Sequence, residues 1–361
     1  MSTPFPYEKL AIGANFYGRD DEKEEICKYA KHSNNLVIYS KRRMGKSSLI
    51  KEAFNNSEYL FIYCDIFDIT SAEDFGSILL KSLSNSIKGD IRTVAKMLGS
   101  MFKRAIPEFT VDPNTAKMSI KPSVKALDFD DMLQDFFNTI YKLSEKQKVV
   151  VAIDEFQQVS TISGIKIDAK LRKYMQESKN ISYIFLGSKR HMLSRLFEHS
   201  APLFEMASSM QLKPLKIDDV YDYTAKHLKI EREQVEYFYN RADGETKLMQ
   251  HICHILYLSH KKKQITNEQI DDAIGEILNA KSSGYRVIFD SFSQYQKKAF
   301  KIISRYNKNI YSEEVLSEYK ISKGTMRSSL KQLYKREIID IDDDRMFIPD
   351  RALELWGKTL Q

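Results

Sequence analysis

The sequence predicts an α/β protein with a parallel-sheet core at residues 1–213, a helical lid at 214–283 and a C-terminal winged helix-turn-helix domain at 284–361. Three observations carry this prediction. Short, uniformly apolar runs alternate with amphipathic helical patterns in the first part of the chain, which is typical of a parallel sheet covered on both faces. After Lys213 and Pro214 only helical patterns continue. The last part reads as helix, helix, turn, helix and two short strands, the order of a winged helix.

Length and composition agree with a folded, multidomain protein. The 361 residues exceed one ordinary domain and suffice for two or three. Hydrophobic residues make up 42% and charged residues 29%, which is close to average globular usage and unlike a disordered chain. No apolar run approaches the roughly 20 residues that cross a bilayer, and the N-terminus lacks a secretory pattern. We therefore expect a cytoplasmic protein that does not contact membranes.

Cysteine and charge usage exclude some classes of protein and leave others open. Cys27, Cys64 and Cys253 are too scattered for a disulfide framework, so we expect reduced thiols. His251 and His254 lie close to Cys253 on a partly apolar helix, where packing is a commoner role than metal binding. The net charge of +7 is spread along the chain and permits contact with a polyanion without arguing for one.

The core pattern begins with a charged amphipathic helix at 20–33 and an apolar strand at 36–39. A loop then leads into a helical pattern from residue 48. Three further apolar strands are expected at 59–64, 149–153 and 182–186. The run at 149–153 is apolar throughout, so both of its faces should be covered.

Between the second and third of these strands the sequence predicts a helix and a hairpin. The helix begins after Asp128, a plausible cap, and carries a broad apolar face that we interpret as core. The segment at about 107–123 alternates apolar and polar residues around Asp-Pro-Asn, which favours an inserted β-hairpin. Its role cannot be read from the sequence.

The C-terminal part divides into a lid and a smaller domain. Helical patterns extend from 218 to about 280, and residues 281–284 (Lys-Ser-Ser-Gly) are typical of a linker. Helices are then expected at 296–306, 312–319 and 323–336, followed by two short strands around 342–344. We interpret this order as a winged helix.

The strongest chemical signal is S-K-R-R-M-G-K-S at residues 40–47, between a buried strand and a helix. In this setting the backbone N–H groups of the loop and the helix N-terminus surround phosphate oxygens. Lys46 supplies a positive charge to the β- and γ-phosphates, and the Ser47 hydroxyl can coordinate Mg²⁺. The spacing matches a Walker A loop (P-loop) except at Ser40, where glycine is usual. A Cβ there is expected to strain the backbone by on the order of 1–3 kcal/mol.

The second signal is V-V-V-A-I-D-E at residues 149–155, a Walker B pattern. A carboxylate at the carboxyl end of a central parallel strand lies where open α/β sheets bind ligands. Asp154 can therefore hold Mg²⁺ through a coordinated water, and Glu155 can act as general base towards the attacking water. The combination is specific because both motifs are needed for the same metal and phosphate.

Four segments together resemble the archaeal-type ATPases, a family in the AAA+-related STAND group of P-loop NTPases. They are F-Y-G-R-D at 16–20, R-R-M-G-K-S-S-L at 42–49, I-D-E-F-Q at 153–157 and F-L-G-S at 185–188. The C-terminal domain, with Pro349, Asp350 and Trp356, is also similar to theirs. The resemblance spans almost the whole chain.

The resemblance implies a nucleotide-driven switch that binds ATP and Mg²⁺ between the P-loop core and the lid. It places Gly18 and Arg19 near the adenine and Ser188 near the γ-phosphate. An alternative remains, in which Gly18-Arg19 only begins a helix and Gly187-Ser188 only ends a strand. The catalytic residues are predicted to be Lys46 and Glu155, and the metal ligands Ser47 and Asp154. The nucleotide-binding residues predicted for the loop are Arg43, Met44, Gly45, Lys46, Ser47 and Ser48.

The sequence departs from this family at positions that affect turnover. Met206 stands where relatives usually carry an arginine, and Thr246 replaces the proline of a Gly-x-Pro sequence. With Ser40, these changes indicate altered nucleotide sensing or slow hydrolysis. Arg42 and Arg43 can offer charge to a phosphate or a neighbouring subunit, but an exposed basic pair needs no special role.

Three functions remain open. The leading hypothesis is an ATPase acting as a conformational switch. The second is a nucleic-acid-binding regulator, although the acidic wing at 340–344 would repel DNA. The basic residues that favour it lie on the third helix of the winged helix and are Lys323, Arg327, Lys331, Lys335 and Arg336. The third is a weakly active ATP-binding scaffold that assembles with a protein partner or with itself. GTP in place of ATP is not excluded.

Overall fold

The computed structural model describes residues 3–87, 91–102, 106–111, 118–123, 128–188, 190–260, 263–306, 308–342 and 345–360. The chain forms two compact units. The core unit comprises Arg19–Ser40 and Lys46–Lys213. The C-terminal unit comprises Met1–Gly18, Lys41–Gly45 and Pro214–Gln361. The loop at 40–47 therefore has its tip in one unit and both of its ends in the other.

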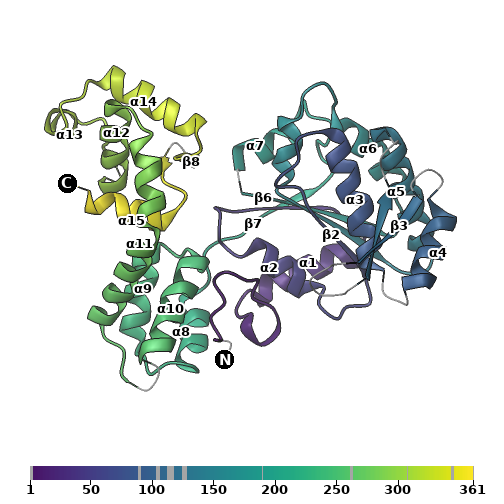
Figure 1. The fold of residues 1–361 in the computed structure, drawn as a ribbon, viewed down its shortest axis with the longest axis horizontal. Helices are drawn as coiled ribbons and strands as arrows, with labels where there is room; N and C mark the ends of the chain where they lie inside the picture. Colours follow the sequence, from purple (N-terminus) through teal and green to yellow (C-terminus); the bar gives the residue numbers. More distant parts are fainter. Residues whose placement is uncertain are drawn as a thin grey trace. The chain divides into compact units, whose positions relative to one another are not determined.

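The core unit contains a five-stranded parallel sheet in the order β2-β5-β6-β1-β7 (Figure 1). Its strands are β1 (Leu36–Tyr39), β2 (Leu60–Asp65), β5 (Val149–Asp154), β6 (Ile181–Gly187) and β7 (Ser208–Gln211). Every residue of β5 and β6 is buried, as the uniformly apolar sequences predict. The four predicted strands are confirmed, and β7 is an additional edge strand.

Helices cover both faces of this sheet (Figure 1). One side carries α1 (Asp20–Lys31) and α2 (Lys46–Ala53), which pack against each other. The other side carries α3 (Ala72–Ser86), α5 (Phe129–Ser144) and α6 (Ile167–Glu177). Alternate residues of β5 belong to the main core cluster with α3 and α5, because successive side chains of a strand point to opposite faces. The short helix α7 (Arg190–Arg195) follows β6.

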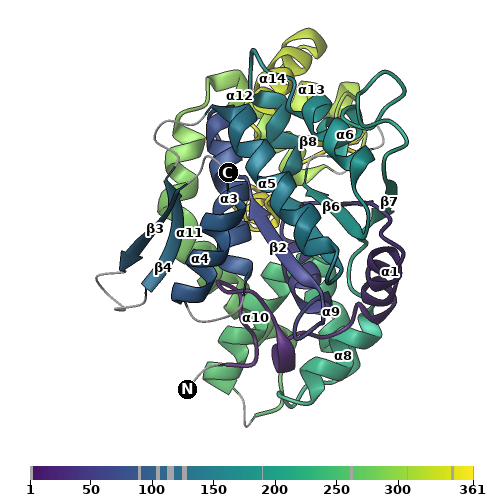
Figure 2. The same ribbon diagram turned by 90° about the vertical axis from the view of Figure 1, so that its right-hand side faces the viewer.

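A β-hairpin and a helix are inserted between β2 and β5. The hairpin pairs β3 (Ile106–Val111) with β4 (Met118–Ser123) in antiparallel register, and α4 (Ile91–Met101) precedes it. Figure 2 shows these elements beside α3. The predicted hairpin strands are confirmed, and the predicted Asp-Pro-Asn turn lies outside the described residues. The predicted cap is also present, since the Asp128 side chain accepts from the backbone N–H of Asp131.

The described part of the C-terminal unit is mainly helical, with one short hairpin and an isolated β-bridge between Lys229 and Gln264. After the 3₁₀ turn η1 (Gly13–Asn15) in its N-terminal segment, it contains α8 (Ile217–Ala225), α9 (Arg232–Ala242), α10 (Thr246–His260), α11 (Asn267–Asp290), α12 (Gln294–Arg305), α13 (Glu313–Glu318) and α14 (Lys323–Lys335). The hairpin strands β8 (Asp340–Asp342) and β9 (Arg345–Phe347) and helix α15 (Arg351–Thr359) complete it. Helices α12 to α14 followed by this hairpin have the order predicted for a winged helix.

The linker predicted at residues 281–284 is wrong. Helix α11 runs without interruption through this segment to Asp290. A Cβ added at Gly284 would meet no atom within 4 Å, so this glycine fits an open helix face rather than a flexible joint. Helices α8 to α11 and the helices that follow them share one hydrophobic cluster. Within the described ranges, no helix combines the length and apolarity needed to cross a membrane.

Candidate functional site

The loop at residues 40–47 joins the carboxyl end of β1 to the first turn of α2. Gly45 has φ +90°, a conformation that L side chains rarely adopt, and a Cβ there would meet no neighbour, so the backbone angle alone requires glycine. Lys46 and Ser47 are the first residues of α2, and the backbone N–H groups of a helix N-terminus favour anions. The predicted strand, loop and helix are therefore present.

The backbone strain expected at Ser40 is absent, since this residue does not adopt a positive φ. Instead the Ser40 side chain has a partner, because Lys46 Nζ donates to Ser40 Oγ over 3.1 Å. The strained loop residue is Arg43, with φ +65°. The serine hydroxyl thus binds the buried ammonium group that the sequence assigns to the phosphates.

The loop at residues 40–47 and the carboxyl end of β5 meet at one carboxylate. Ser47 Oγ donates to Asp154 Oδ2 over 2.6 Å, and Asp154 is 3% exposed at the carboxyl end of β5. Tyr63, on the neighbouring strand β2, donates to the same oxygen over 2.5 Å. Burial, followed by the charge of Asp154, raises the pKa of Tyr63, so the phenol remains a donor. The structure therefore brings the two predicted metal ligands together.

Glu155 follows Asp154 with a left-handed backbone, at φ +56°. It occupies the N-cap position of the 3₁₀ helix η2 (Phe156–Thr161), and its backbone N–H donates to Asp154 Oδ1 over 2.9 Å. Ser188 Oγ, just after β6, donates to Glu155 Oε2 over 2.8 Å, and Gln157 donates to the same oxygen. Glu155 and Ser188, predicted on separate motifs, are therefore in direct contact.

Two residues at the end of β2 belong to this site although the sequence reasoning did not select them. Tyr63 contacts Asp154, and Asp65 pairs with Asp154 across the β2–β5 register. Burial raises the pKa of Asp65, and the charges of Asp154 and Glu155 add to this effect. The available signal was the run Y-C-D at the carboxyl end of a strand that neighbours the Asp-Glu strand.

The donor set at Ser47 and Asp154 fits Mg²⁺. One alcohol and one carboxylate oxygen are hard ligands, and Mg²⁺ usually takes only one or two protein ligands together with waters and phosphates. The described residues contain no cluster of three or more His, Cys, Asp or Glu that could hold a metal ion. His251 and His254 have other partners, since His251 stacks on Tyr7 and His254 Nδ1 hydrogen-bonds with Thr3.

The tip of the loop pairs with acidic groups of the C-terminal unit. Lys41 Nζ lies 3.3 Å from Asp243, and Arg42 lies 3.0 Å from Glu337. Arg43 lies 2.5 Å from Asp350 and 3.8 Å from Glu245. Each of the three successive basic residues is thus paired with an acidic group.

The first turn of α10 also reaches the loop backbone. The Lys247 N–H donates to the Arg43 carbonyl over 3.2 Å, and Thr246 Oγ1 donates to the Met44 carbonyl over 3.4 Å. Thr246, which replaces the expected proline, therefore adds a contact that proline cannot make. Met44 itself is buried.

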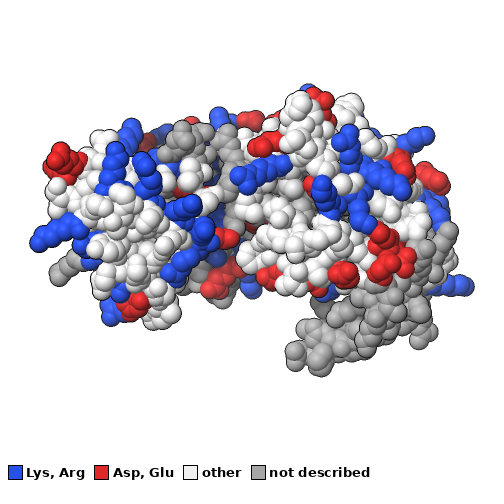
Figure 3. Space-filling model, turned by 90° about the horizontal axis from the view of Figure 1, so that it is seen from above, with Lys and Arg blue, Asp and Glu red and all other residues white. Residues whose placement is uncertain are grey.

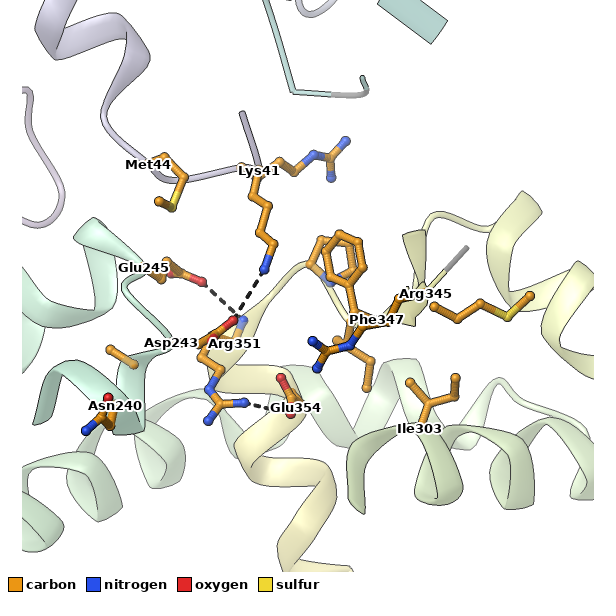
Figure 4. A pocket seen from close by; sticks show the side chains of 15 residues that line it. Lys41, Met44, Asn240, Asp243, Glu245, Ile303, Arg345, Phe347, Arg351 and Glu354 are labelled. Atoms are coloured by element: carbon orange, nitrogen blue, oxygen red, sulfur yellow. Dashed lines mark hydrogen bonds and ion pairs between the residues drawn. The ribbon is translucent and has the colours of Figure 1, made fainter. Parts of the chain in front are cut away.

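A cavity of about 250 Å³ lies beside this loop tip (Figure 4). Lys41 and Met44 line it from the loop, and Phe347 and Arg351 line it from the C-terminal segment. Two ion pairs lie along its wall, because Lys41 contacts Asp243 over 3.3 Å and Arg351 contacts Glu354 over 2.6 Å. Part of the ion-pair network at the loop tip therefore lines this cavity.

Two carboxylates, Glu245 and Asp350, lie beside Arg43, and their pKa values are shifted in opposite directions. Burial raises the pKa of Glu245 to about 7, against the opposing effect of Arg43. Burial also acts on Asp350, but the hydrogen bond and charge of Arg43 outweigh it and leave the pKa of Asp350 below its usual value. Asp350 is therefore the firmly ionised partner of the loop arginine.

The structure gives Gly18 and Arg19 packing roles. A Cβ at Gly18 would lie 3.0 Å from atoms of Asp219 and Leu215, and its φ is +63°. Arg19 is buried at the N-cap position of α1, and it donates to Glu22 over 2.9 Å and to the Lys213 carbonyl over 2.6 Å. Their contact with adenine remains a prediction.

The remaining predicted positions are placed as follows. Ser48 lies in the first turn of α2, one residue beyond Ser47, the predicted metal ligand. Met206 packs against the hydrophobic core of the core unit, so its side chain offers no positive charge in place of the expected arginine. The three cysteines are free thiols.

Comparison with known proteins gives a family match. The family model described as an ATPase domain predominantly from Archaea matches residues 16–252. A search of curated proteins found no match.

Solved structures with the same fold include archaeal proteins. The Walker-type ATPase PABY2304 of Pyrococcus abyssi has a TM-score of 0.65 and 16% identity, covering 99% of this chain and 100% of that chain. The ADP form of the Aeropyrum pernix ORC2 protein has a TM-score of 0.57 and 11% identity, covering 98% of each chain. The Aeropyrum pernix ORC1 protein in complex with DNA has a TM-score of 0.51 and 12% identity, covering 95% of this chain and 92% of that chain. Identities this low are evidence of a shared fold only.

Proposed function

Because the chain belongs to the family of ATPase domains found predominantly in Archaea, we propose that it binds ATP with Mg²⁺ at residues 40–47 and hydrolyses it as a conformational switch. The observation that carries the proposal is the 2.6 Å contact between Ser47 and Asp154. It joins the loop that would hold phosphates to the carboxylate that would hold the metal. Neither motif alone is as specific.

The residues of the core unit divide the proposed reaction among them. The Lys46 ammonium group leaves Ser40 and neutralises the β- and γ-phosphates, which the backbone N–H groups of the loop and α2 surround. Mg²⁺, held by Ser47 and Asp154 when bound, would supply charge neutralisation of the phosphate oxygens. Glu155 accepts a proton from water as the water oxygen bonds to the γ-phosphorus. The bond from the γ-phosphorus to the β,γ-bridging oxygen breaks, and ADP takes its electron pair.

The switch is supported by how the loop is built. Lys46 and Ser47 belong to the core unit, whereas Arg43 forms ion pairs within the C-terminal unit. The free energy of binding a phosphate at this loop depends on the positive charge of Arg43. It therefore differs between a state in which Arg43 is paired with Asp350 and a state in which Arg43 is unpaired. Such a difference in binding free energy is what allows a ligand to shift a conformational equilibrium.

Phosphate release tests this proposal. We expect Lys46→Ala to abolish nucleotide binding, because it removes the charge that faces the phosphates. Glu155→Gln should bind ATP normally but lose roughly 10²–10⁴-fold in turnover, since only the proton acceptor is changed. Rapid release by pure Glu155→Gln protein would refute the role of the base. Wild-type turnover equal to that of Lys46→Ala would instead favour a weakly active interaction scaffold.

A second function, nucleic-acid binding by the C-terminal helices, is favoured by one specific observation. Lys323, Arg327, Lys331 and Lys335 are exposed and spaced four residues apart along α14. This spacing puts them on one face of the helix. Figure 3 shows Lys and Arg side chains gathered over this part of the C-terminal unit. We call these four residues of α14 the basic ridge. A winged helix would present this basic ridge to DNA phosphates.

Binding of duplex DNA at several salt concentrations tests whether the basic ridge of α14 contacts phosphates. The double substitution Arg327→Ala with Lys331→Ala should weaken binding and reduce the slope of log K against log salt by about 2, one unit per lost phosphate contact. Lys226→Ala with Lys229→Ala, on exposed residues at and after the end of α8, is the control with an equal change of charge. Equal effects of the two double substitutions would contradict a specific role for α14.

A further inference from the structure

Gln157 is a buried polar residue beside the proposed base. It is the second residue of η2 and is 1% exposed, with Phe156 and Val159 buried on either side of it. An amide in such surroundings lowers stability unless its polar atoms are hydrogen-bonded. Its presence there therefore needs a physical reason.

The Gln157 amide is only half satisfied. Its Nε2 donates to Glu155 Oε2, but within the described part of the chain no donor reaches its oxygen, Oε1. A buried acceptor without a partner costs free energy, and an apolar side chain of similar shape would avoid that cost. Stability alone does not account for a glutamine at this position.

The surrounding backbone is shaped to accept the amide. A Cβ added at Gly187, the last residue of β6, would lie 2.5 Å from Gln157 Oε1. Real Cβ atoms essentially never approach so closely, so any larger residue at 187 would displace the amide. The next residue, Ser188, donates the second hydrogen bond to Glu155. The Gly187-Ser188 pair thus makes room for one donor and supplies the other.

Both donors reach the same oxygen of Glu155. Ser188 Oγ and Gln157 Nε2 converge on Oε2, and no other described residue donates to Oε1. Two directional bonds fix the rotation of a carboxylate more firmly than one. The result is a carboxylate held by one oxygen, with the other left to accept a proton.

We propose that Gln157 is a positioning residue, which together with Ser188 holds Glu155 so that Oε1 faces the attacking water. This inference rests on the proposed ATPase function. Gln157 itself does not touch the reacting atoms, and its effect acts through the orientation of Glu155.

Gln157→Met tests the role because methionine keeps the length and volume of the side chain and removes its donor. We expect kcat for ATP to fall roughly tenfold to a hundredfold, while the Kd for ATP stays within about twofold. The melting temperature should change by no more than about 3 °C, since the lost hydrogen bond is offset by removal of the unsatisfied oxygen. A merely structural residue would lower stability together with activity.

Gln158→Met is the matched control. Gln158 lies in the same 3₁₀ helix and is half-buried, but its side chain makes no hydrogen bond to Glu155 among the contacts described. This variant should keep the wild-type kcat. In a Glu155→Gln background, Gln157→Met should cause no further loss, because the group that it positions is already absent. A full tenfold loss in that background, or unchanged kcat in Gln157→Met alone, would overturn the proposal.

Crystal structures of wild type and Gln157→Met separate this inference from the proposed function. If wild-type turnover equals that of Lys46→Ala, the ATPase proposal fails. The position of Glu155 in the two crystal structures then still shows whether Gln157 holds this carboxylate. A Glu155 carboxylate that leaves Ser188 in Gln157→Met would support the positioning role. A carboxylate that keeps its wild-type rotamer would overturn it.

Discussion

At the scale of single residues, Glu245 has the most unusual environment described in the loop network. It is 6% exposed, and burial raises its pKa to about 7 although Arg43 lies 3.8 Å away. In the unfolded chain a glutamate titrates near 4.5. Between these two values the folded state binds more protons than the unfolded state, so stability must fall as the pH rises through this window.

Glu245→Gln should remove this pH dependence. The amide can still accept from the Arg351 N–H, which bonds to Glu245 over 3.1 Å in the structure, but it does not titrate. The shift corresponds to at most about 3 kcal/mol. Thermal unfolding of both proteins at pH 5 and pH 8 provides the measurement. The wild type should lose more stability than the variant over that interval, and equal losses would show that Glu245 titrates normally when folded.

Other single residues show what a motif can and cannot predict. The two motifs that contain Ser47 and Asp154 were sufficient to predict that these residues meet, because the loop and the strand end belong to one sheet. The effect of Ser40 was predicted wrongly, since a missing glycine was interpreted as strain. The structure shows that the serine has an acceptable backbone and a hydroxyl that binds Lys46. A side-chain contact of this kind depends on local geometry that spacing does not contain.

At the scale of elements, α15 connects the C-terminal helices to the loop. Its cap residue Asp350 accepts from the backbone N–H groups of Ala352 and Leu353 and also pairs with Arg43. One carboxylate therefore both begins a helix and binds the P-loop arginine.

Substitutions at Asp350 separate these two roles. Asparagine keeps the cap but loses the charge, so Asp350→Asn should lower the free energy of unfolding by about 1–2 kcal/mol. Asp350→Ala should cost about 1 kcal/mol more because the cap is lost as well. The side chains of Arg43 and Asp350 are 32% and 22% exposed. Breaking this pair should therefore lower stability less than breaking a fully buried ion pair would.

Glu337→Gln serves as the control for the Asp350 series. It breaks the pair between Arg42 and Glu337, whose side chains are 37% and 50% exposed, and should cost less than about 0.5 kcal/mol. Urea or thermal unfolding gives the three values. A loss in Glu337→Gln as large as that in Asp350→Asn would contradict the distinction between the two ion pairs.

Elements with strong apolar patterns were predictable, and weakly patterned ones were not. Strands β1, β5 and β6 lie inside the sheet, where apolar side chains are required on both faces. Strand β7 reads Ser-Ser-Met-Gln and lies at the edge, so its backbone pairing leaves little trace in its composition. The false linker at 281–284 has a related cause, because helix α11 is stabilised by packing elsewhere along its length and tolerates Ser and Gly on an open face.

At the scale of the whole molecule, the chain forms two compact units that share one loop. The ends of residues 40–47 belong to the core unit, and the tip belongs to the C-terminal unit. The sequence predicted the parallel sheet and the helices after it, because periodicity reports on buried faces. It could not predict the pairing of Lys41, Arg42 and Arg43 with acids about 200 to 300 positions away, since no periodic pattern relates residues at that separation.

The central claim is that Lys46 holds ATP phosphates beside a metal bound by Ser47 and Asp154. Calorimetric titration of ATP, with and without Mg²⁺, tests it most directly on wild type, Lys46→Ala and Asp154→Asn. Wild type should bind ATP more tightly with Mg²⁺, Asp154→Asn should lose this gain but keep metal-free binding, and Lys46→Ala should lose both. Wild-type affinity retained by Lys46→Ala, or a gain from Mg²⁺ that survives in Asp154→Asn, would contradict the account.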